Sequence, residues 1–232
     1  MTRLTILEAD QVRPELAEHY GGYPGMFEAL LLEAGADFEI HCVDVRKTLP
    51  EQIDSDIYLI TGSRHSVYEP LDWIAPLASF IAEVLAAEKT AMGICFGHQL
   101  MAHFFGGEVS PSKQGWAVGV HTSRPMIEAD WMQPAAQQIS LLASHQDQVS
   151  ALPENAEVYL GNDFCPVGGM IIGDHAITIQ GHPEFSPEYM QSLMEGRRER
   201  IGKKVVEAAV ASLSQPTDEL TLFRWMLNFC LK

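Results

Sequence analysis

The segment Thr90-Ala91-Met92-Gly93-Ile94-Cys95-Phe96-Gly97-His98-Gln99 is the clearest indication of the fold, because an apolar run ends there in a cysteine between two glycines. Small residues at Gly93 and Gly97 permit a sharp turn from a strand into a helix, which presents the central side chain at the top of a sheet. The free N–H groups at the start of that helix favour a thiolate over a thiol. The pattern predicts a nucleophile at Cys95.

A second motif, Gln180-Gly181-His182-Pro183-Glu184, follows the alternating run Ala176-Ile177-Thr178-Ile179. Residues i and i+2 of an extended segment share a face, so His182 and Glu184 can project together. A carboxylate at that position can hold the imidazole in the tautomer that accepts a proton from sulfur. We therefore expect Cys95, His182 and Glu184 to form a catalytic triad.

A rival histidine lies in Ser144-His145-Gln146-Asp147, which also has a carboxylate two residues after the imidazole. Both motifs supply the residue types that a general base and its orienting group need. Spacing alone does not separate His145 from His182, so both remain candidates on these grounds.

Four runs of residues up to the cysteine motif have the pattern of β-strands: Leu4–Leu7, Phe38–Val43, Ile57–Ile60 and Thr90–Ile94. Apolar residues at helical spacing lie between these runs. This alternation predicts a parallel sheet covered by helices on both faces, with the functional crevice at the carboxyl ends of the strands.

The pattern changes between about residues 108 and 181. Short alternating runs broken by Gly, Pro, Asn and Asp predict an antiparallel section; they are Gly115–Val120, Ile139–Ala143, Glu157–Leu160, Met170–Ile172 and Ala176–Ile179. Ser186-Pro187-Glu188 then opens a helix. The expected fold is a single α/β, flavodoxin-like domain over residues 1–232, with a mainly parallel central sheet, a small antiparallel section and a helical C-terminal segment from about 186 to 232.

Composition limits the possible partners. Lys and Arg number 15 against 31 Asp and Glu, which gives a formal charge of −16 and argues against nucleic acid, since a surface that follows phosphates needs the opposite sign. The one basic cluster, Arg197-Arg198-Glu199-Arg200 with Lys203 and Lys204, is interpreted as a solvated helix face. We expect no membrane partner and a cytoplasmic location, because no apolar run reaches membrane-span length and no signal-peptide pattern follows Met1.

The four cysteines lack a C-x-x-C pair and the spacing of metal ligands. We therefore expect reduced thiols and no metal site. No phosphate-binding loop is present in the sequence, so ATP chemistry is not expected of this chain.

The motifs resemble those of the class I glutamine amidotransferases, particularly stand-alone proteins similar to the glutaminase domain of GMP synthetase. The resemblance covers most of the chain: besides GICFGHQ at 93–99 and GHPE at 181–184, it includes Tyr23–Phe27, Thr61–Tyr68, Gly115–Gly119 and Ser144–Asp147. It implies hydrolysis of a γ-glutamyl amide through a thioester, with no metal or organic cofactor.

The resemblance also implies roles for single residues. It matches His182 and Glu184 to the catalytic histidine and glutamate, and places Ser144 and His145 in the wall of the glutamine site. Gln99 lies one helical turn beyond Cys95 and resembles the glutamine-holding residue, whose amide can meet the ammonium or the carboxylate of the substrate.

Attack on the amide creates an oxyanion, which two backbone N–H groups can stabilise. Phe96 begins the helix directly after Cys95, so its N–H is the first expected donor. The resemblance implies that the second comes from the turn Thr61-Gly62-Ser63-Arg64. Relatives commonly carry glycine where Ser63 stands, and both Gly62 and Ser63 remain candidates for that donor.

The first expected function is glutaminase activity that releases glutamate and supplies ammonia to a separate synthase subunit, because the length leaves no room for an acceptor domain. The alternative is a stand-alone γ-glutamyl peptidase or hydrolase acting on a γ-glutamyl small molecule, which needs a roomier pocket around Ser144–Asp147 and Gly115–Gly119. A non-catalytic binding or regulatory protein on the same fold is the third possibility.

Overall fold

The computed structural model describes residues 1–232, and nine of its strands form one sheet in the order β2-β1-β3-β4-β11-β10-β9-β6-β7. The first five strands in this order are mutually parallel: β2 (Phe38–Asp44), β1 (Thr2–Glu8), β3 (Ile57–Ile60), β4 (Thr90–Ile94) and β11 (Ala176–Ile179). The next four pair antiparallel: β10 (Gly169–Ile172), β9 (Ala156–Gly161), β6 (Ala117–Pro125) and β7 (Ile139–His145). A separate two-stranded antiparallel sheet consists of β5 (Glu108–Pro111) and β8 (Asp147–Ala151).

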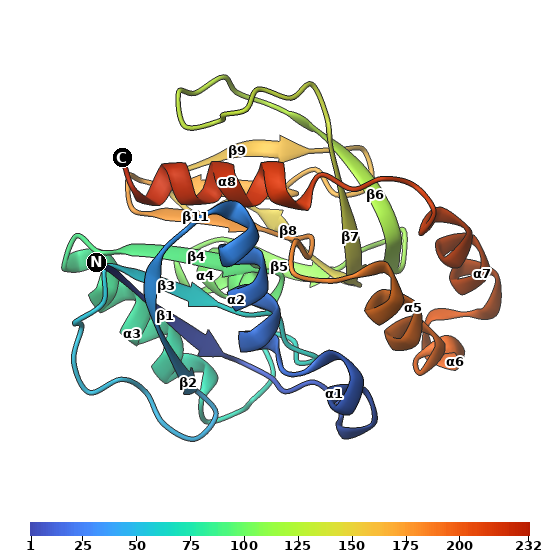
Figure 1. Cartoon of the computed structure of the whole chain (residues 1–232), viewed down its shortest axis with the longest axis horizontal. Coiled ribbons are helices and arrows are strands. Elements are labelled where there is room, and N and C mark those ends of the chain that lie inside the picture. The colour runs from blue at the N-terminus through green and yellow to red at the C-terminus, as the bar shows by residue number, and fades with distance from the viewer.

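Helices cover both faces of the parallel part (Figure 1). On one face lie α2 (Tyr23–Ala34) and α8 (Glu219–Cys230), which pack against each other; on the other lie α3 (Ile74–Ala86) and α4 (Phe96–Phe104). The remaining helices are α1 (Pro14–Tyr20), α5 (Pro187–Glu195), α6 (Arg198–Ile201) and α7 (Lys203–Ser212). They gather beside the β6 and β7 end of the sheet, at the lower right of Figure 1.

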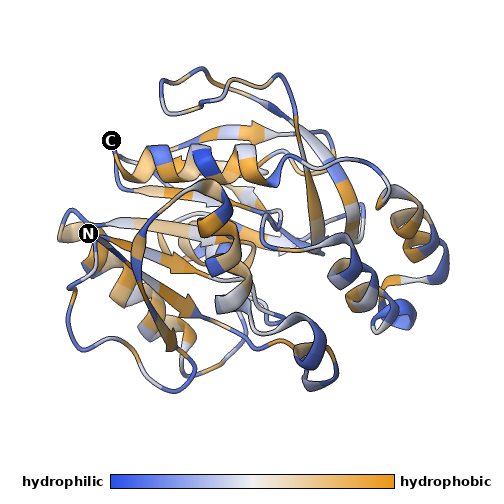
Figure 2. Cartoon of the chain, viewed as in Figure 1, coloured by the Kyte–Doolittle hydropathy of each residue, from blue (hydrophilic) through white to orange (hydrophobic).

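The parallel strands are buried on both faces, so their side chains alternate between two apolar layers. In β1, Leu4 and Ile6 belong to the layer beneath α2 and α8, whereas Leu7 belongs to the layer beneath α3 and α4. In β3, Leu59 and Ile60 divide in the same way. This double burial gives the central strands their largely orange colour in Figure 2.

The α/β fold class predicted from the sequence is confirmed, and Ile57–Ile60 and Thr90–Ile94 are strands with the predicted bounds. One assignment needs correction: Ala176–Ile179 pairs antiparallel with β10 but parallel with β4, so it completes the parallel part of the sheet. All four of its residues are buried, and a strand that is apolar on both faces gives no sign of its direction. Strands β5 and β8 were not predicted, because each is short and partly exposed.

The C-terminal segment begins as predicted. Ser186 caps α5 by accepting a hydrogen bond from the Tyr189 N–H at 3.1 Å. At the other end of the segment, Phe223 and Trp225 of α8 are completely buried in the layer shared with α2. The segment is therefore part of the main core. None of the helices is long and apolar enough to cross a membrane.

Candidate active site

Cys95 stands at a strained turn between β4 and α4, with φ +49° and ψ −93°. A Cβ added to Gly93 would lie 2.7 Å from the carbonyl carbon of Gly97, and one added to Gly97 would lie 2.7 Å from the Ile60 carbonyl oxygen. Both positions must therefore be glycine for strand and helix to approach this closely. The predicted elbow is present, and it is held by packing on both sides of the cysteine.

Three strand ends converge at this turn. Ile94 of β4 is in register with Ile179 of β11, and Gly93 is in register with Ile60 of β3. Neighbouring parallel strands end at the same edge of a sheet, so the residues that follow them meet there. The backbone N–H of Cys95 donates to the Ile179 carbonyl at 2.8 Å, which fastens the elbow to the strand that leads to His182.

His182 and Glu184 form a buried pair beside Cys95. The His182 Nδ1 lies 2.8 Å from the Glu184 Oε1, and the Glu184 side chain is only 1% exposed. Because a carboxylate accepts, Nδ1 carries the proton and Nε2 is left for the sulfur. Burial lowers the pKa of His182, but the charges of Glu184 and the Cys95 thiolate outweigh it, and the net shift is upward.

An aromatic neighbour that sequence reasoning missed supports this histidine. The Phe185 ring stacks on the His182 imidazole with centroids 4.0 Å apart, and Tyr189 packs edge-on against Phe185 at 4.7 Å. The available signal was its position directly after Glu184, where the chain leaves the extended segment.

The rival histidine, His145, is placed differently. Its Nδ1 donates to the backbone carbonyl of Asp147 at 3.2 Å, not to the carboxylate, which accepts from the hydroxyls of Ser66 and Tyr68. Burial, aided by the charge of nearby histidines including His182, lowers the pKa of His145 to about 3. His145 is therefore a neutral imidazole whose Nε2 can accept a hydrogen bond.

Gly62 lies directly against the candidate catalytic pair. A Cβ at this position would be 3.0 Å from Cε1 of His182 and 3.6 Å from Cβ of Cys95. The N–H groups of Gly62 and Ser63 donate no hydrogen bond within the chain. Phe96 is the first residue of α4, so its N–H has no acceptor in its own helix. All three expected donors are thus free, and they flank Cys95.

Gln99 is more restricted than the sequence suggests. Both hydrogens of its amide nitrogen are used, in bonds to the Asp147 carbonyl at 2.8 Å and to the Gln180 Oε1 at 2.9 Å. Only the amide oxygen remains, and an oxygen accepts. Gln99 can therefore meet the ammonium of a γ-glutamyl group but not its carboxylate.

Two adjoining cavities open at Cys95. The larger, of about 60 Å³, is lined on its polar side by Gln99, Ser144, His145, Asp147, Arg197 and Arg200. The smaller, of about 20 Å³, is bordered by Tyr23, His182, Phe185, Leu193 and Arg197. Cys95, Ser63, Arg64 and Ser144 line both cavities. Ser144 accepts a long hydrogen bond from the Arg197 Nη1, at 3.4 Å.

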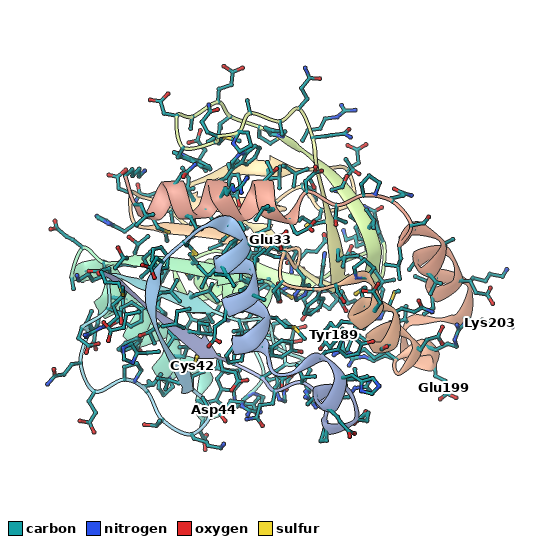
Figure 3. The ribbon with its side chains drawn as sticks, viewed as in Figure 1. Glu33, Cys42, Asp44, Tyr189, Glu199 and Lys203 are labelled. Atoms are coloured by element: carbon teal, nitrogen blue, oxygen red, sulfur yellow. The ribbon has the colours of Figure 1, made fainter.

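The basic cluster divides between the site and the solvent. Arg197 and Arg200 face the larger cavity, where the Arg200 guanidinium lies over the Trp116 ring at 5.1 Å. Figure 3 shows Glu199 and Lys203 directed outward at the edge of the molecule. The interpretation of this cluster as a solvated face is therefore wrong for Arg197, which is partly buried, whereas Arg200 is exposed and also borders the cavity. Their spacing of three residues on a helical turn was the signal that they share a face.

Neither Arg197 nor Arg200 forms an ion pair, whereas Arg64 pairs with Asp10 and Arg198 pairs with Glu195. Their hydrogen bonds to these carboxylates raise the pKa of Arg64 and of Arg198. Burial lowers the pKa of Arg197, which is the direction expected of a desolvated cation without an anionic partner. In a chain of net charge −16, two unpaired guanidinium groups beside the candidate nucleophile form a local anion-binding surface.

Comparisons with known proteins identify relatives of this chain. γ-Glutamyl peptidases 3 and 4 of Arabidopsis thaliana are 28% and 31% identical to this chain, over 86% and 76% of it and 82% and 73% of their own lengths. A glutamine-hydrolysing GMP synthase of Aromatoleum aromaticum is 32% identical over 64% of this chain, but that match covers 29% of the synthase.

A solved glutamine amidotransferase from Thermotoga maritima shares the fold with a TM-score of 0.76 and 18% identity, covering 100% of this chain and 97% of its own. The sequence profile of the class-I glutamine amidotransferases matches residues 16–196, which include the elbow, the turn at Gly62 and Ser63 and the His182 motif. Relatives of this family hydrolyse amide bonds, and their similarity extends over most of the chain. This protein is a member of the class-I glutamine amidotransferase family and an enzyme.

Proposed function

We propose that this enzyme hydrolyses γ-glutamyl amide bonds by itself, through a thioester on Cys95, and that its preferred substrates are γ-glutamyl amino acids or peptides. The observation that carries the reaction is the meeting of Cys95 and the buried His182–Glu184 pair at adjacent strand ends. The observation that carries the substrate class is the pair of unpaired arginines beside them.

In the first step the Cys95 thiolate attacks the γ-carbonyl carbon, and the Phe96 N–H with one N–H from Gly62 or Ser63 stabilises the oxyanion. The C–N bond then breaks, and the His182 Nε2 gives its proton to the departing nitrogen. In the second step a water attacks the thioester while His182 takes up its proton. Glutamate leaves, and Cys95 regains its thiolate. Glu184 orients the imidazole throughout and stabilises its charged form.

We place the leaving group at the opening of the smaller cavity, because the departing nitrogen must lie next to His182, which borders this cavity. Arg197 borders that cavity as well as the larger one. Glutamine carries a single carboxylate, which its own ammonium balances. Its leaving group is ammonia, which has no carboxylate for an arginine to bind. A γ-glutamyl amino acid brings a second carboxylate, which Arg197 can bind at the leaving-group end while Arg200 faces the carboxylate of the glutamyl end. The names of the Arabidopsis relatives support this substrate class.

The first experiment compares amine release from glutamine, γ-glutamylglycine and γ-glutamylglycinamide, with Cys95→Ala as the blank. We expect turnover to depend on Cys95 and to be fastest for γ-glutamylglycine. Arg197→Gln should lower kcat/KM for γ-glutamylglycine by about 10- to 100-fold, since a hydrogen-bonded charge pair contributes roughly 1.5–3 kcal/mol, and should change γ-glutamylglycinamide hydrolysis little.

Arg198→Gln is the matched control, because it removes the same charge from the neighbouring residue, which faces Glu195. An equal loss of kcat/KM for γ-glutamylglycine and γ-glutamylglycinamide in Arg197→Gln would indicate that this arginine binds the glutamyl end of the substrate. Strict preference for glutamine by the unaltered enzyme would exclude the peptidase assignment.

The second candidate is a glutaminase that supplies ammonia to a separate synthase subunit. The match to a glutamine-hydrolysing GMP synthase favours this candidate. It covers 29% of the synthase, so most of that protein has no counterpart in the matched part of this chain. In that case the isolated chain should hydrolyse only glutamine, slowly, and a co-purifying synthase should raise its rate. The absence of any stimulating partner together with fast dipeptide turnover would reject this candidate.

A further inference from the structure

The backbone turn at Gly62 and Ser63 is fastened to the end of β1 by a buried carboxylate. Asp10 follows β1, and its side chain is 3% exposed. Its Oδ2 accepts from the backbone N–H of Arg64 at 2.9 Å and from Nε of the same arginine at 2.7 Å. The Arg64 Nη2 donates to the Gln11 carbonyl at 2.8 Å, and the Gln11 N–H donates back to the Asp10 Oδ1 at 2.8 Å.

These bonds fix the two peptide planes on either side of Ser63. The Ser63–Arg64 plane is set by the bond from the Arg64 N–H to Asp10. The Gly62–Ser63 plane is set by its carbonyl, which accepts from the Thr61 hydroxyl at 3.1 Å. In a trans peptide the N–H and C=O point in opposite directions, so a held carbonyl also fixes the direction of the Ser63 N–H. The Ser63 N–H therefore cannot turn away without breaking the bond from the Thr61 hydroxyl, and the plane that follows it is held by Asp10.

An ion pair between a buried carboxylate and a partly exposed guanidinium adds little net stability, because desolvation of the carboxylate offsets an attraction that solvent screens. Its value here is conformational. We infer that Asp10 is a positioning residue which, through Arg64, holds the turn in the conformation that offers its N–H groups to the oxyanion. The oxyanion hole is then preformed within this chain. This inference rests on the proposed function, and it explains how the enzyme works without a partner.

The test separates reactions of Cys95 that form an oxyanion from those that do not. Acylation by p-nitrophenyl acetate passes through a tetrahedral oxyanion and carries no carboxylate that Arg64 could bind. Alkylation by iodoacetamide is a displacement at carbon and forms no oxyanion, yet it needs the same activated thiolate. The ratio of acylation rate to alkylation rate therefore reports the oxyanion hole alone, whatever the natural substrate is.

We expect Asp10→Asn to lower this ratio about tenfold and Asp10→Ala by up to about 100-fold, since one oxyanion donor is worth about 10²–10³ in rate. Arg64→Lys should cost less than either, because its backbone N–H can still bond to Asp10. Asp56→Asn is the matched control: this carboxylate also accepts from a backbone N–H and a cation, at the opposite end of the same strands.

An unchanged ratio in a folded Asp10→Asn protein, checked by its thermal melt, would overturn the inference. So would a parallel fall of both rates, because that would indicate general disruption of the site. The unaltered enzyme can be acylated and alkylated at Cys95 and yet hydrolyse no γ-glutamyl compound. That result would reject the proposed function, but the ratio of acylation to alkylation in the Asp10 variants would still decide the positioning role.

Discussion

The His182 and Phe185 rings lie face to face, with centroids 4.0 Å apart and planes inclined by only 6°. Glu184 holds the imidazole by its edge through Nδ1, whereas Phe185 fixes the plane of the ring. In the proposed mechanism the ring face also stabilises the imidazolium form of His182. The position of His182 thus depends on two consecutive residues that contact it from different directions.

Replacing Phe185 with leucine should lower kcat about three- to tenfold, because an aromatic pair contributes roughly 0.5–1.5 kcal/mol beyond its buried area. KM should change little, since Phe185 acts through His182. Steady-state kinetics with γ-glutamylglycine would measure this. Phe164→Leu removes a comparable ring from His121, at 5.3 Å, and serves as the control. An equal effect of the two substitutions would argue against a positioning role.

Glu184→Gln should shift the alkaline limb of the pH–rate profile to lower pH. The negative charge of Glu184 helps to raise the pKa of His182, so the neutral amide allows the imidazolium to lose its proton earlier as pH rises. The measurement is kcat/KM against pH. Glu39→Gln, which changes an exposed His–Glu pair on β2, should leave the profile in place. An alkaline limb that stays fixed in Glu184→Gln would contradict this assignment.

Two inactive variants should differ in stability. Cys95→Gly should have a larger free energy of unfolding than Cys95→Ala by about 1 kcal/mol, because an L side chain at φ +49° is strained and glycine is not. Denaturant unfolding of both proteins would measure the difference. If the alanine variant were the more stable of the two, packing of the Cβ group would outweigh the backbone strain at the elbow.

Gly62→Ala should lower kcat at least tenfold with little change in thermal stability. The added methyl would lie 3.0 Å from Cε1 of His182, so the imidazole must move by a few tenths of an ångström, and catalysis tolerates such displacement poorly. Gly25→Ala in α2, where a Cβ meets no atom within 4 Å, is the control. Full activity in Gly62→Ala would place the His182 ring in a different orientation during turnover.

Local rules predicted the α/β fold, the elbow at Cys95 and the shared face of His182 and Glu184. The choice of His182 over His145 came from the family resemblance, because both motifs obey the same rule. A glycine-flanked elbow, apolar strands on both sides and an i, i+2 pair in an extended segment are all readable within a few residues. The strand pattern also predicted that the turn at Gly62 and Ser63 lies at the same sheet edge as Cys95, because neighbouring parallel strands end there. The role of these residues as oxyanion donors comes from the family resemblance and stays a prediction.

Which charges belong to the site depends on contacts between distant parts of the chain. Arg197 and Arg200 lie at and just after the start of α6, and Asp10 reaches Arg64 across 54 positions. No local pattern could show that the two arginines lack carboxylates, or that Asp10 is buried against Arg64. The direction of Ala176–Ile179 was likewise decided by its neighbours. Pairing and desolvation are properties of what surrounds a side chain, and those surroundings exist only after the chain has folded.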